Sequence, residues 1–406
     1  MKQDKRVVLL VVVAALGYFV DIYDLIVFNV VKKESLQHLG FFGEDLKKYE
    51  IYLFNLQMTG MLIGGLLWGI LGDKRGRVSV LFGSIFLYSI ANIANAFVTN
   101  IDQYALVRFI AGIGLAGELG AGITLVAENM PKEKRGYGTM IIVTFGALGA
   151  VVAGLVGKSF GWQTTYIVGG CLGLTLLLLR AGAYESGMYQ SLLHQSHIKR
   201  GNFLSLFKKS SLFFKYLSCI LIGLPIWFAI GVLVNLSPRF AEAHGLLEGI
   251  DVADSVMFAY LGLSVGDLIS GLLSQFMRSR KKVVFLYLGF SLILMLVYLF
   301  NTHVSVVYYK YMCFGIGFAT GYWALFVTIA SEQFGTNIRS TVTNTVPNFV
   351  RGAVVPITLS FASLSKTNGV VFAAFWVGMA CLLLAFVATV YIKDSFSKDL
   401  NYFEID

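Results

Sequence analysis

RFIAGIGLAG at residues 108–117 returns as YMCFGIGFAT at residues 311–320, about half the chain length later. The segment IGGLLWGILGDKRGR from Ile63 also returns, as VGDLISGLLSQFMRSR from Val265, at nearly the same offset. An internal repeat of this kind in an apolar chain is typical of a membrane protein built from two similar helix bundles. In such proteins the substrate lies between the bundles, near the middle of the bilayer.

The composition excludes an ordinary soluble enzyme. Of the 406 residues, 57% are apolar or aromatic and only 14% are charged, whereas soluble domains have about 45–50% apolar and about 25% charged residues. A mean hydropathy of +0.73 indicates an integral membrane protein. The four cysteines lie within apolar runs and indicate neither disulfides nor a metal cluster.

Apolar runs bounded by charged residues predict twelve spans, because each crossing helix needs about 20 apolar residues. We expect the spans at residues 7–31, 50–72, 78–98, 104–129, 136–157, 164–181, 213–236, 253–277, 282–301, 305–333, 340–364 and 368–392. The predicted fold is an all-α integral membrane protein with twelve transmembrane helices in two pseudo-symmetric six-helix bundles. We expect the N-terminal bundle over residues 1–181, a cytoplasmic linker over 182–212, and the C-terminal bundle with a short cytoplasmic tail over 213–406.

The distribution of basic residues predicts the orientation. Most of the 32 Lys and Arg residues lie in the loops on the side of the N-terminus, which the positive-inside rule places in the cytoplasm. We therefore expect a multi-pass protein of the cell inner (plasma) membrane with both termini cytoplasmic. The net charge of +9 then reflects the excess of basic residues in the cytoplasmic loops. We therefore expect the lipid bilayer as a partner and no nucleic acid. We also expect a monomer.

Four motifs carry a family resemblance. GILGDKRGR at 69–77 resembles the loop signature of the major facilitator superfamily, and Arg108 with its glycines resembles the fourth-span motif of that family. ENMPKEKRG at 128–136 is similar to the end of that span in the sugar, phosphate and organic-ion branches. DIYD at 21–24 is similar to the D-x-x-D of phosphate and organic-acid symporters. The resemblance covers the whole chain and implies a transporter that works by rocker-switch alternating access.

The loop signature predicts a conformational latch at the cytoplasmic face. Its members are expected to be Asp73, Arg77, Glu128 and Arg135. Pairs of Arg and carboxylate can hold helices of the two bundles together in one state of the cycle. The alternative interpretation is a solvated surface loop.

Ionisable residues within the predicted spans are the candidates for function, since a charge in the bilayer costs several kcal/mol. Arg351 is a permanent cation whose fork matches a carboxylate or phosphate. The resemblance to the organic-ion branch, in which the charge of span eleven selects between anions and cations, also predicts that Arg351 binds an anionic substrate. The alternative is a structural ion pair of Arg351 with Asp267 or Glu118.

Buried carboxyl groups are suited to proton coupling, because burial favours their neutral form. An acid that gains a proton outside and loses it inside would couple anion entry to the proton gradient. We assign this role to Asp21, Asp24, Glu118, Asp267 and Arg108.

Aromatic residues near these charges are predicted to line the substrate cavity: Tyr23, Trp227, Tyr322 and Trp323. Trp and Tyr near the end of a span are alternatively interfacial anchors.

The predicted function is secondary active transport of a small organic anion, carboxylate or phosphate-bearing, with protons. The alternative is a proton-coupled exporter of drugs, metal chelates or other metabolites. We expect no enzymatic activity and no cofactor. We also expect no metal site, because His194 and His197 have no Cys or acidic partner nearby. GIGLAG matches a dinucleotide fingerprint but lies inside an apolar span, where close helix packing explains its glycines better.

Overall fold

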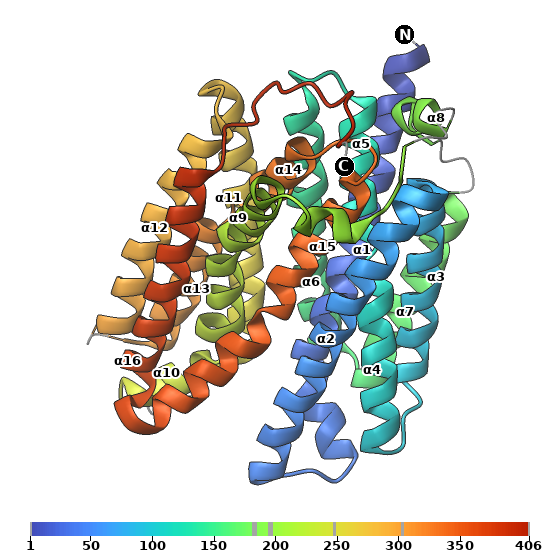
Figure 1. The fold of residues 1–406 in the computed structure, drawn as a ribbon. Coiled ribbons are helices and arrows are strands. Elements are labelled where there is room, and N and C mark those ends of the chain that lie inside the picture. The colour runs from blue at the N-terminus through green and yellow to red at the C-terminus, as the bar shows by residue number, and fades with distance from the viewer. Residues whose placement is uncertain (1, 181–184, 194–197, 247–248, 302–303, 405–406) are drawn as a thin grey trace.

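The computed structural model describes residues 2–180, 185–193, 198–246, 249–301 and 304–404, and these residues form helices without any strand (Figure 1). Eleven helices of the described chain are long and apolar enough to cross a membrane. The last of them, Arg339–Tyr391, contains two crossings because the chain reverses at Gly369. The backbone there has φ +75°, which glycine adopts without strain. The all-α membrane fold predicted from the sequence is confirmed.

The helices follow one another along the chain with short connections. In order they are α1 (Lys2–His38), α2 (Gly43–Arg75), α3 (Arg77–Asn95), α4 (Ile101–Leu115), α5 (Glu118–Asn129), α6 (Arg135–Ser159), α7 (Trp162–Leu179), α8 (Gly187–Leu193), η1 (Phe203–Phe207), α9 (Ser210–Phe228), η2 (Ala229–Val234), α10 (Ser237–Ala243), α11 (Val252–Phe276), α12 (Arg280–Phe300), α13 (Val306–Thr320), α14 (Trp323–Gln333), α15 (Arg339–Gly352) and α16 (Val354–Tyr391).

Several spans that the sequence predicts as continuous are broken in the middle. The predicted span 104–129 divides into α4 and α5, and the span 305–333 divides into α13 and α14. Both breaks follow the repeated glycine motif. In the seventh span α9 contains Pro225 and continues as the π-helix η2, because proline removes a backbone donor and disturbs the helical ladder.

Glycines let the helices approach closely. A Cβ at Gly112 on α4 would overlap the carbonyl oxygen of Gln57 on α2, and a Cβ at Gly60 would overlap that of Phe109. Gly317 and Gly262 make the corresponding contact between α13 and α11. Small residues at helix crossings are typical of membrane proteins, which agrees with the interpretation of GIGLAG as a packing motif.

The first half of the chain meets the second mainly where α6 packs against α11 and α2 packs against α15, and also where α15 meets α5 and α14 meets α6. The polar side chains of α15 meet glycines of α2 and α5. A Cβ atom built on Gly72 would crowd Ser340, and one on Gly69 would crowd Thr341. In the same way, a Cβ atom on Gly120 would crowd Asn344, and one on Gly65 would crowd Asn348. The end of the bundle that carries α8, η1 and the C-terminal tail, at the top of Figure 1, is called the linker face below, and the opposite end the distal face.

Substituting Gly112 with Ala should destabilise the protein by about 1–3 kcal/mol, because the new methyl group meets backbone that cannot move aside. Gly289 is the matched control, since it is exposed on α12 and a Cβ there meets nothing within 4 Å. Gly289→Ala should leave the midpoint of thermal unfolding in detergent unchanged or slightly raised. Equal midpoints for the two variants would contradict this packing.

Candidate functional site

A small cavity lies between the two halves of the chain. Its lining is mainly apolar and aromatic, with a single charged residue. From the first half it is lined by Tyr18, Ile22 and Ala147, and from the second half by Ile226, Trp227, Ile230, Tyr260, Leu263, Trp323 and Arg351. Small-molecule sites are typically apolar clefts with a few placed polar groups. The lining of this cavity, aromatic and apolar with one cation, is of that kind.

Arg351 is a buried cation without an acidic partner in the part of the chain that the structure describes. Its side chain is 1% exposed, and Nη1 donates to Oδ1 of Asn348 at 3.3 Å. Nε and Nη2 have no hydrogen-bond partner. These two nitrogens form one edge of the guanidinium, which is the edge that binds a carboxylate in a bidentate manner.

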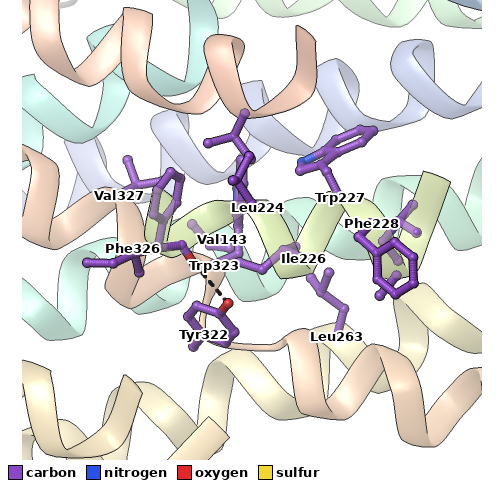
Figure 2. Packing of buried hydrophobic residues seen from close by; sticks show 14 of the residues in the cluster. Val143, Leu224, Ile226, Trp227, Phe228, Leu263, Tyr322, Trp323, Phe326 and Val327 are labelled. Carbon is purple, nitrogen blue, oxygen red and sulfur yellow. Dashed lines mark hydrogen bonds between the residues drawn. The ribbon is translucent and has the colours of Figure 1, made fainter. Parts of the chain in front are cut away.

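Two indole rings flank the guanidinium of Arg351. Its carbon lies 5.5 Å from the ring centre of Trp323 and 5.9 Å from that of Trp227. The two tryptophans meet edge to face at 6.4 Å, and Nε1 of Trp323 donates to the hydroxyl of Tyr18 at 2.9 Å. Figure 2 shows Trp227 on α9 and Trp323 on α14 within the apolar packing around the cavity. The structure thus brings Arg351, Trp227 and Trp323 together.

Tyr23 and Tyr322 do not line the cavity, contrary to the prediction. The Tyr23 hydroxyl donates to the carbonyl of Thr165 at 3.0 Å, and the Tyr322 hydroxyl donates to that of Ile222 at 2.9 Å (Figure 2). Each hydroxyl therefore bonds two helices within its own half of the chain. Tyr260 lines the cavity instead; periodicity alone could not distinguish these tyrosines.

Asp21 and Asp24 are fully buried on α1, and none of their carboxylate oxygens has a hydrogen-bond partner among the described residues. Arg351 is the charged group that acts most strongly on Asp21, while Asp21 and Arg108 act on Asp24. Arg108 is also fully buried, and its three nitrogens have no partner within the described chain. Asp21 and Asp24 are therefore electrostatically coupled to each other, and Arg351 and Arg108 each act on one of them.

The environment of Arg108 is otherwise aromatic. Its guanidinium carbon lies 5.2 Å from the ring centre of Phe28 and 5.7 Å from that of Tyr166. Aromatic faces attract cations, so Arg108 is stabilised without being neutralised.

Glu118 and Asp267 have partners other than Arg351, so the alternative of a structural ion pair with either acid is wrong. Both oxygens of Glu118 bond to Arg180, one at 2.8 Å from Nη1. Arg180 also donates to the carbonyl of Val13 at 3.1 Å. Asp267 accepts a hydrogen bond of 2.8 Å from the backbone nitrogen of Ala324, near the start of α14.

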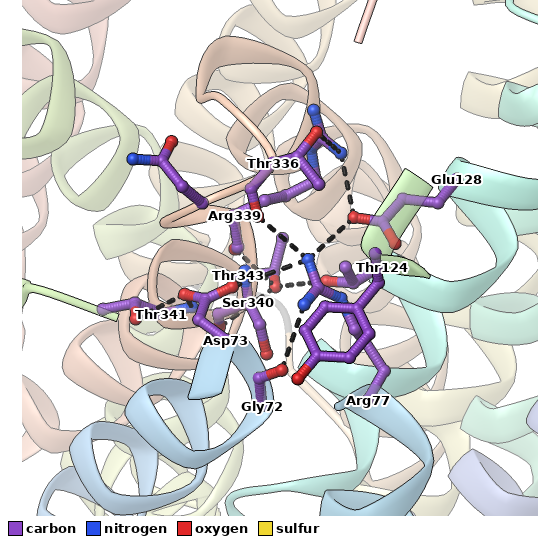
Figure 3. Close-up of polar contacts among 12 residues, drawn as sticks. Gly72, Asp73, Arg77, Thr124, Glu128, Thr336, Arg339, Ser340, Thr341 and Thr343 are labelled. Atoms are coloured by element: carbon purple, nitrogen blue, oxygen red, sulfur yellow. Dashed lines mark hydrogen bonds and ion pairs between the residues drawn. The ribbon is translucent and has the colours of Figure 1, made fainter. Parts of the chain in front are cut away.

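Glu128 is the centre of a buried charge cluster on the linker face (Figure 3). One of its oxygens accepts from Arg77 at 2.9 Å and from Arg339 at 2.9 Å, while the other accepts from Ser186. Arg339 belongs to the second half of the chain, so Glu128 joins the halves. The interpretation of this motif as a solvated surface loop is wrong, because Arg77 and Arg339 are fully buried.

Asp73 lies beside this cluster and also accepts hydrogen bonds from the second half of the chain (Figure 3). Its carboxylate accepts from the backbone nitrogens of Ser340 and Thr341 at 3.1 and 2.8 Å, and from the Thr341 hydroxyl at 2.7 Å. It also lies 3.5 Å from Arg77. The first turn of α15 is therefore capped by an acid from α2, which suits the positive end of a helix.

Arg135 does not join Glu128, contrary to the prediction. Its Nη1 donates to the carbonyl of Lys398 in the C-terminal tail at 3.0 Å. Arg339 of the second half takes the place beside Glu128 instead. The second half has its own pair, because Arg280 contacts Glu332 at 3.3 Å. The sequence did not reveal this pair because Gln275 replaces the acid of the first motif.

The C-terminal tail closes over these motifs. The carbonyl of Leu400, which is fully buried, accepts from Arg339 Nη2 at 2.6 Å and from the Thr336 hydroxyl at 3.1 Å. Asp394 accepts from Ser279 and from the backbone nitrogen of Arg280. Although burial opposes its charge, these bonds hold the pKa of Asp394 below its usual range.

The distal face is joined by a more exposed contact. Lys158 at the end of α6 pairs with Asp251 at 3.3 Å and with Asp254 of α11. The Lys158 side chain is 39% exposed, whereas Arg77, Glu128 and Arg339 of the linker face are buried. Exposed pairs contribute little to stability, so the two ends of the bundle are closed unequally.

His194 and His197 lie outside the described residues. Within the described ranges no group of three His, Cys, Asp or Glu side chains is arranged to hold a metal ion.

Membrane transporters are among the known proteins to which this chain is similar. A relative in Bacillus subtilis (strain 168), named as a candidate niacin/nicotinamide transporter, NiaP, is 26% identical over 92% of this chain and 94% of its own. The sialic acid transporter NanX of Escherichia coli (strain K12) is 25% identical over 80% of each chain. The solved proton:xylose symporter XylE has the same fold, with a TM-score of 0.77 over 98% of both chains at 16% identity.

The model of the Major Facilitator Superfamily matches residues 14–346, which is most of the chain. The relatives and the fold are those of membrane transporters and not of enzymes. The chain belongs to the Major Facilitator Superfamily.

Proposed function

We propose that this chain is a secondary active transporter that moves a small organic anion together with protons by alternating access. The observation that carries the proposal is the free Nε–Nη2 edge of Arg351, a fully buried cation at a cavity between the two halves. A buried charge is usually paired, so a cation left without an acid is best explained by an anion that binds and leaves.

The aromatic lining narrows the substrate to a carboxylate on a single ring. Trp227 and Trp323 offer flat faces beside Arg351, against which a planar ring can stack. The names of two relatives, for niacin and for sialic acid, include carboxylic acids and support this class. An exporter of lipophilic cations is disfavoured, because Arg351 would repel its substrate.

Proton coupling is assigned to these coupled buried charges. Asp21 interacts with Arg351 and with Asp24, and Asp24 also interacts with Arg108. An anion bound at Arg351 adds negative charge beside Asp21, which favours uptake of a proton by the acids. Charge carried in by the substrate would thereby be balanced by protons.

The linker face is assigned to the cytoplasm, with both termini there and the protein in the cell inner membrane. The described conformation would then be closed on the cytoplasmic side. Glu128, Asp73 and the tail must separate from their partners when residues 1–181 and 213–406 rock as two bundles. The latch thus consists of Asp73, Arg77, Glu128 and Arg339, and Arg135 acts through the tail.

The first prediction concerns Arg351. Nicotinate at about 100 times its dissociation constant should stabilise the purified protein by about 2.7 kcal/mol, and Arg351→Gln should abolish this thermal shift. Arg351→Lys should retain only part of it, because a lysine lacks the two-nitrogen edge. The neutral nicotinamide should produce a smaller shift than nicotinate.

Arg239→Gln, on α10 and outside the cavity lining, is the control and should keep the full shift. Stabilisation by lipophilic cations alone, unchanged in Arg351→Gln, would favour the exporter and refute the anion transporter.

The second prediction concerns coupling. Asp24→Asn should stop accumulation of nicotinate driven by a proton gradient in proteoliposomes, because the side chain can no longer carry a proton. Exchange of labelled for unlabelled nicotinate should continue. Asp45→Asn, at an exposed position on α2, should behave like the wild type. Gradient-driven accumulation that survives in Asp24→Asn would rule out a coupling role for this residue.

The third prediction concerns the latch. Glu128→Gln leaves Arg77 and Arg339 buried without their shared acid, and breaking a buried pair costs about 3–5 kcal/mol. The linker face should therefore open more often. A cysteine at Thr343, which is buried and bonded to Thr124 of the first half at 2.6 Å, reports this opening by thiol labelling.

The background for labelling is Cys171→Ser, since Cys171 is exposed and the other three cysteines are buried. Glu128→Gln should label several times faster than Glu133→Gln, the exposed neighbouring acid. Equal labelling rates would show that Glu128 does not hold the face closed.

A further inference from the structure

We propose that Asn348 is a positioning residue that makes anion binding at Arg351 depend on contact between the two halves of the chain. This inference rests on the proposed function of Arg351. It adds a link between the binding site and the closed linker face that neither site shows when considered alone.

The side-chain amide of Asn348 has hydrogen-bond partners at both its nitrogen and its oxygen. Its Nδ2 donates to the carbonyl of Ala116 at 2.8 Å and to that of Asn344 at 2.7 Å, and its Oδ1 accepts from Arg351 Nη1 at 3.3 Å. Asparagine offers two amide donors and one carbonyl acceptor, so each function has a partner. The side chain is 1% exposed, and water therefore cannot replace a lost bond easily.

One of these bonds crosses between the halves. Ala116 belongs to the break between α4 and α5 in the first half, whereas Asn348 and Arg351 belong to α15 in the second. The approach is close, because a Cβ built on Gly65 of α2 would lie 2.8 Å from the Asn348 Cβ. The amide is thus clamped by the first half while it holds Arg351.

The clamp determines which edge of Arg351 faces the ligand. With Nη1 engaged by Asn348, the Nε–Nη2 edge remains free. If the guanidinium rotated, a different pair of nitrogens would face the cavity, and the carboxylate would have to shift to keep two parallel hydrogen bonds.

During alternating access the hydrogen bond from Asn348 to Ala116 links anion binding to the closed linker face. When α15 separates from α2 and α5, the bond from Asn348 to Ala116 must break, and the amide is then free to turn away from Arg351. The anion should bind more tightly while the linker face is closed and more weakly when it opens. By linkage, a bound anion must favour the closed face to the same extent.

The matched control is Asn344, one turn earlier on the same helix. It packs against Gly120 of the first half, but its Nδ2 bonds only to Ser340 within α15. It makes no hydrogen bond to Arg351. Replacing it removes a similar volume from the interface and leaves the positioning bond intact.

The first readout is the affinity of the full-length protein for nicotinate. Asn348→Ala should raise the dissociation constant about tenfold, the loss expected for one hydrogen bond to a charged group, while Asn344→Ala should change it less than about twofold by the same reasoning. Asn348→Asp should bind still more weakly, because the new carboxylate competes for Arg351. Unchanged affinity in Asn348→Ala or Asn348→Asp would overturn the proposal.

The second readout distinguishes positioning from a merely structural role. With Thr343→Cys in the Cys171→Ser background, saturating nicotinate should slow thiol labelling about fivefold or more, at the lower end of usual coupling between sites. In Asn348→Ala, nicotinate at full occupancy should no longer slow it, and in Asn344→Ala it should. Protection that persists in Asn348→Ala would refute the link.

Failure of the proposed function would look different. Nicotinate would then fail to bind the wild type, or would bind equally well to Arg351→Gln. Binding that requires Arg351 but is unaffected by Asn348→Ala would refute only the positioning role.

Discussion

A cation buried without an acid is the constraint on which the rest of this structure depends. Arg351 lies at a cavity whose other lining residues are apolar or aromatic. The protein stabilises it by Asn348 and by the faces of two indole rings. These contacts are weaker than an ion pair, and they leave one edge of the guanidinium available to a ligand.

The remainder of the fold brings that edge to the interface of two halves that can separate. Glycines on α2 and α5 let polar side chains of α15 approach closely, so the interface near the linker face consists of hydrogen bonds and ion pairs. Such contacts are directional and can be exchanged for others, whereas a tightly packed apolar interface would resist opening. The unequal closure of the two faces is therefore consistent with one state of a cycle between two.

Hydropathy was sufficient to predict the fold, because the bilayer requires helices of a set length. The rarity of charge in apolar spans also identified Asp21, Asp24, Arg108 and Arg351. The partners could not be predicted in the same way. Arg180 lies at the end of its predicted span, yet its long side chain reaches Glu118. The contact of Arg339 with Glu128, and the directions of the tyrosine hydroxyls, depend on tertiary packing that no local pattern encodes.

The most direct measurement is an experimental structure of the full-length protein with bound nicotinate. We expect the carboxylate within hydrogen-bond distance of both Nε and Nη2 of Arg351, with the pyridine ring against Trp227 and Trp323. Asn348 should still hold Nη1 if the linker face is closed. A ligand bound elsewhere, or Arg351 paired with Asp21 while the ligand is present, would contradict the assignment of Arg351 as the anion site.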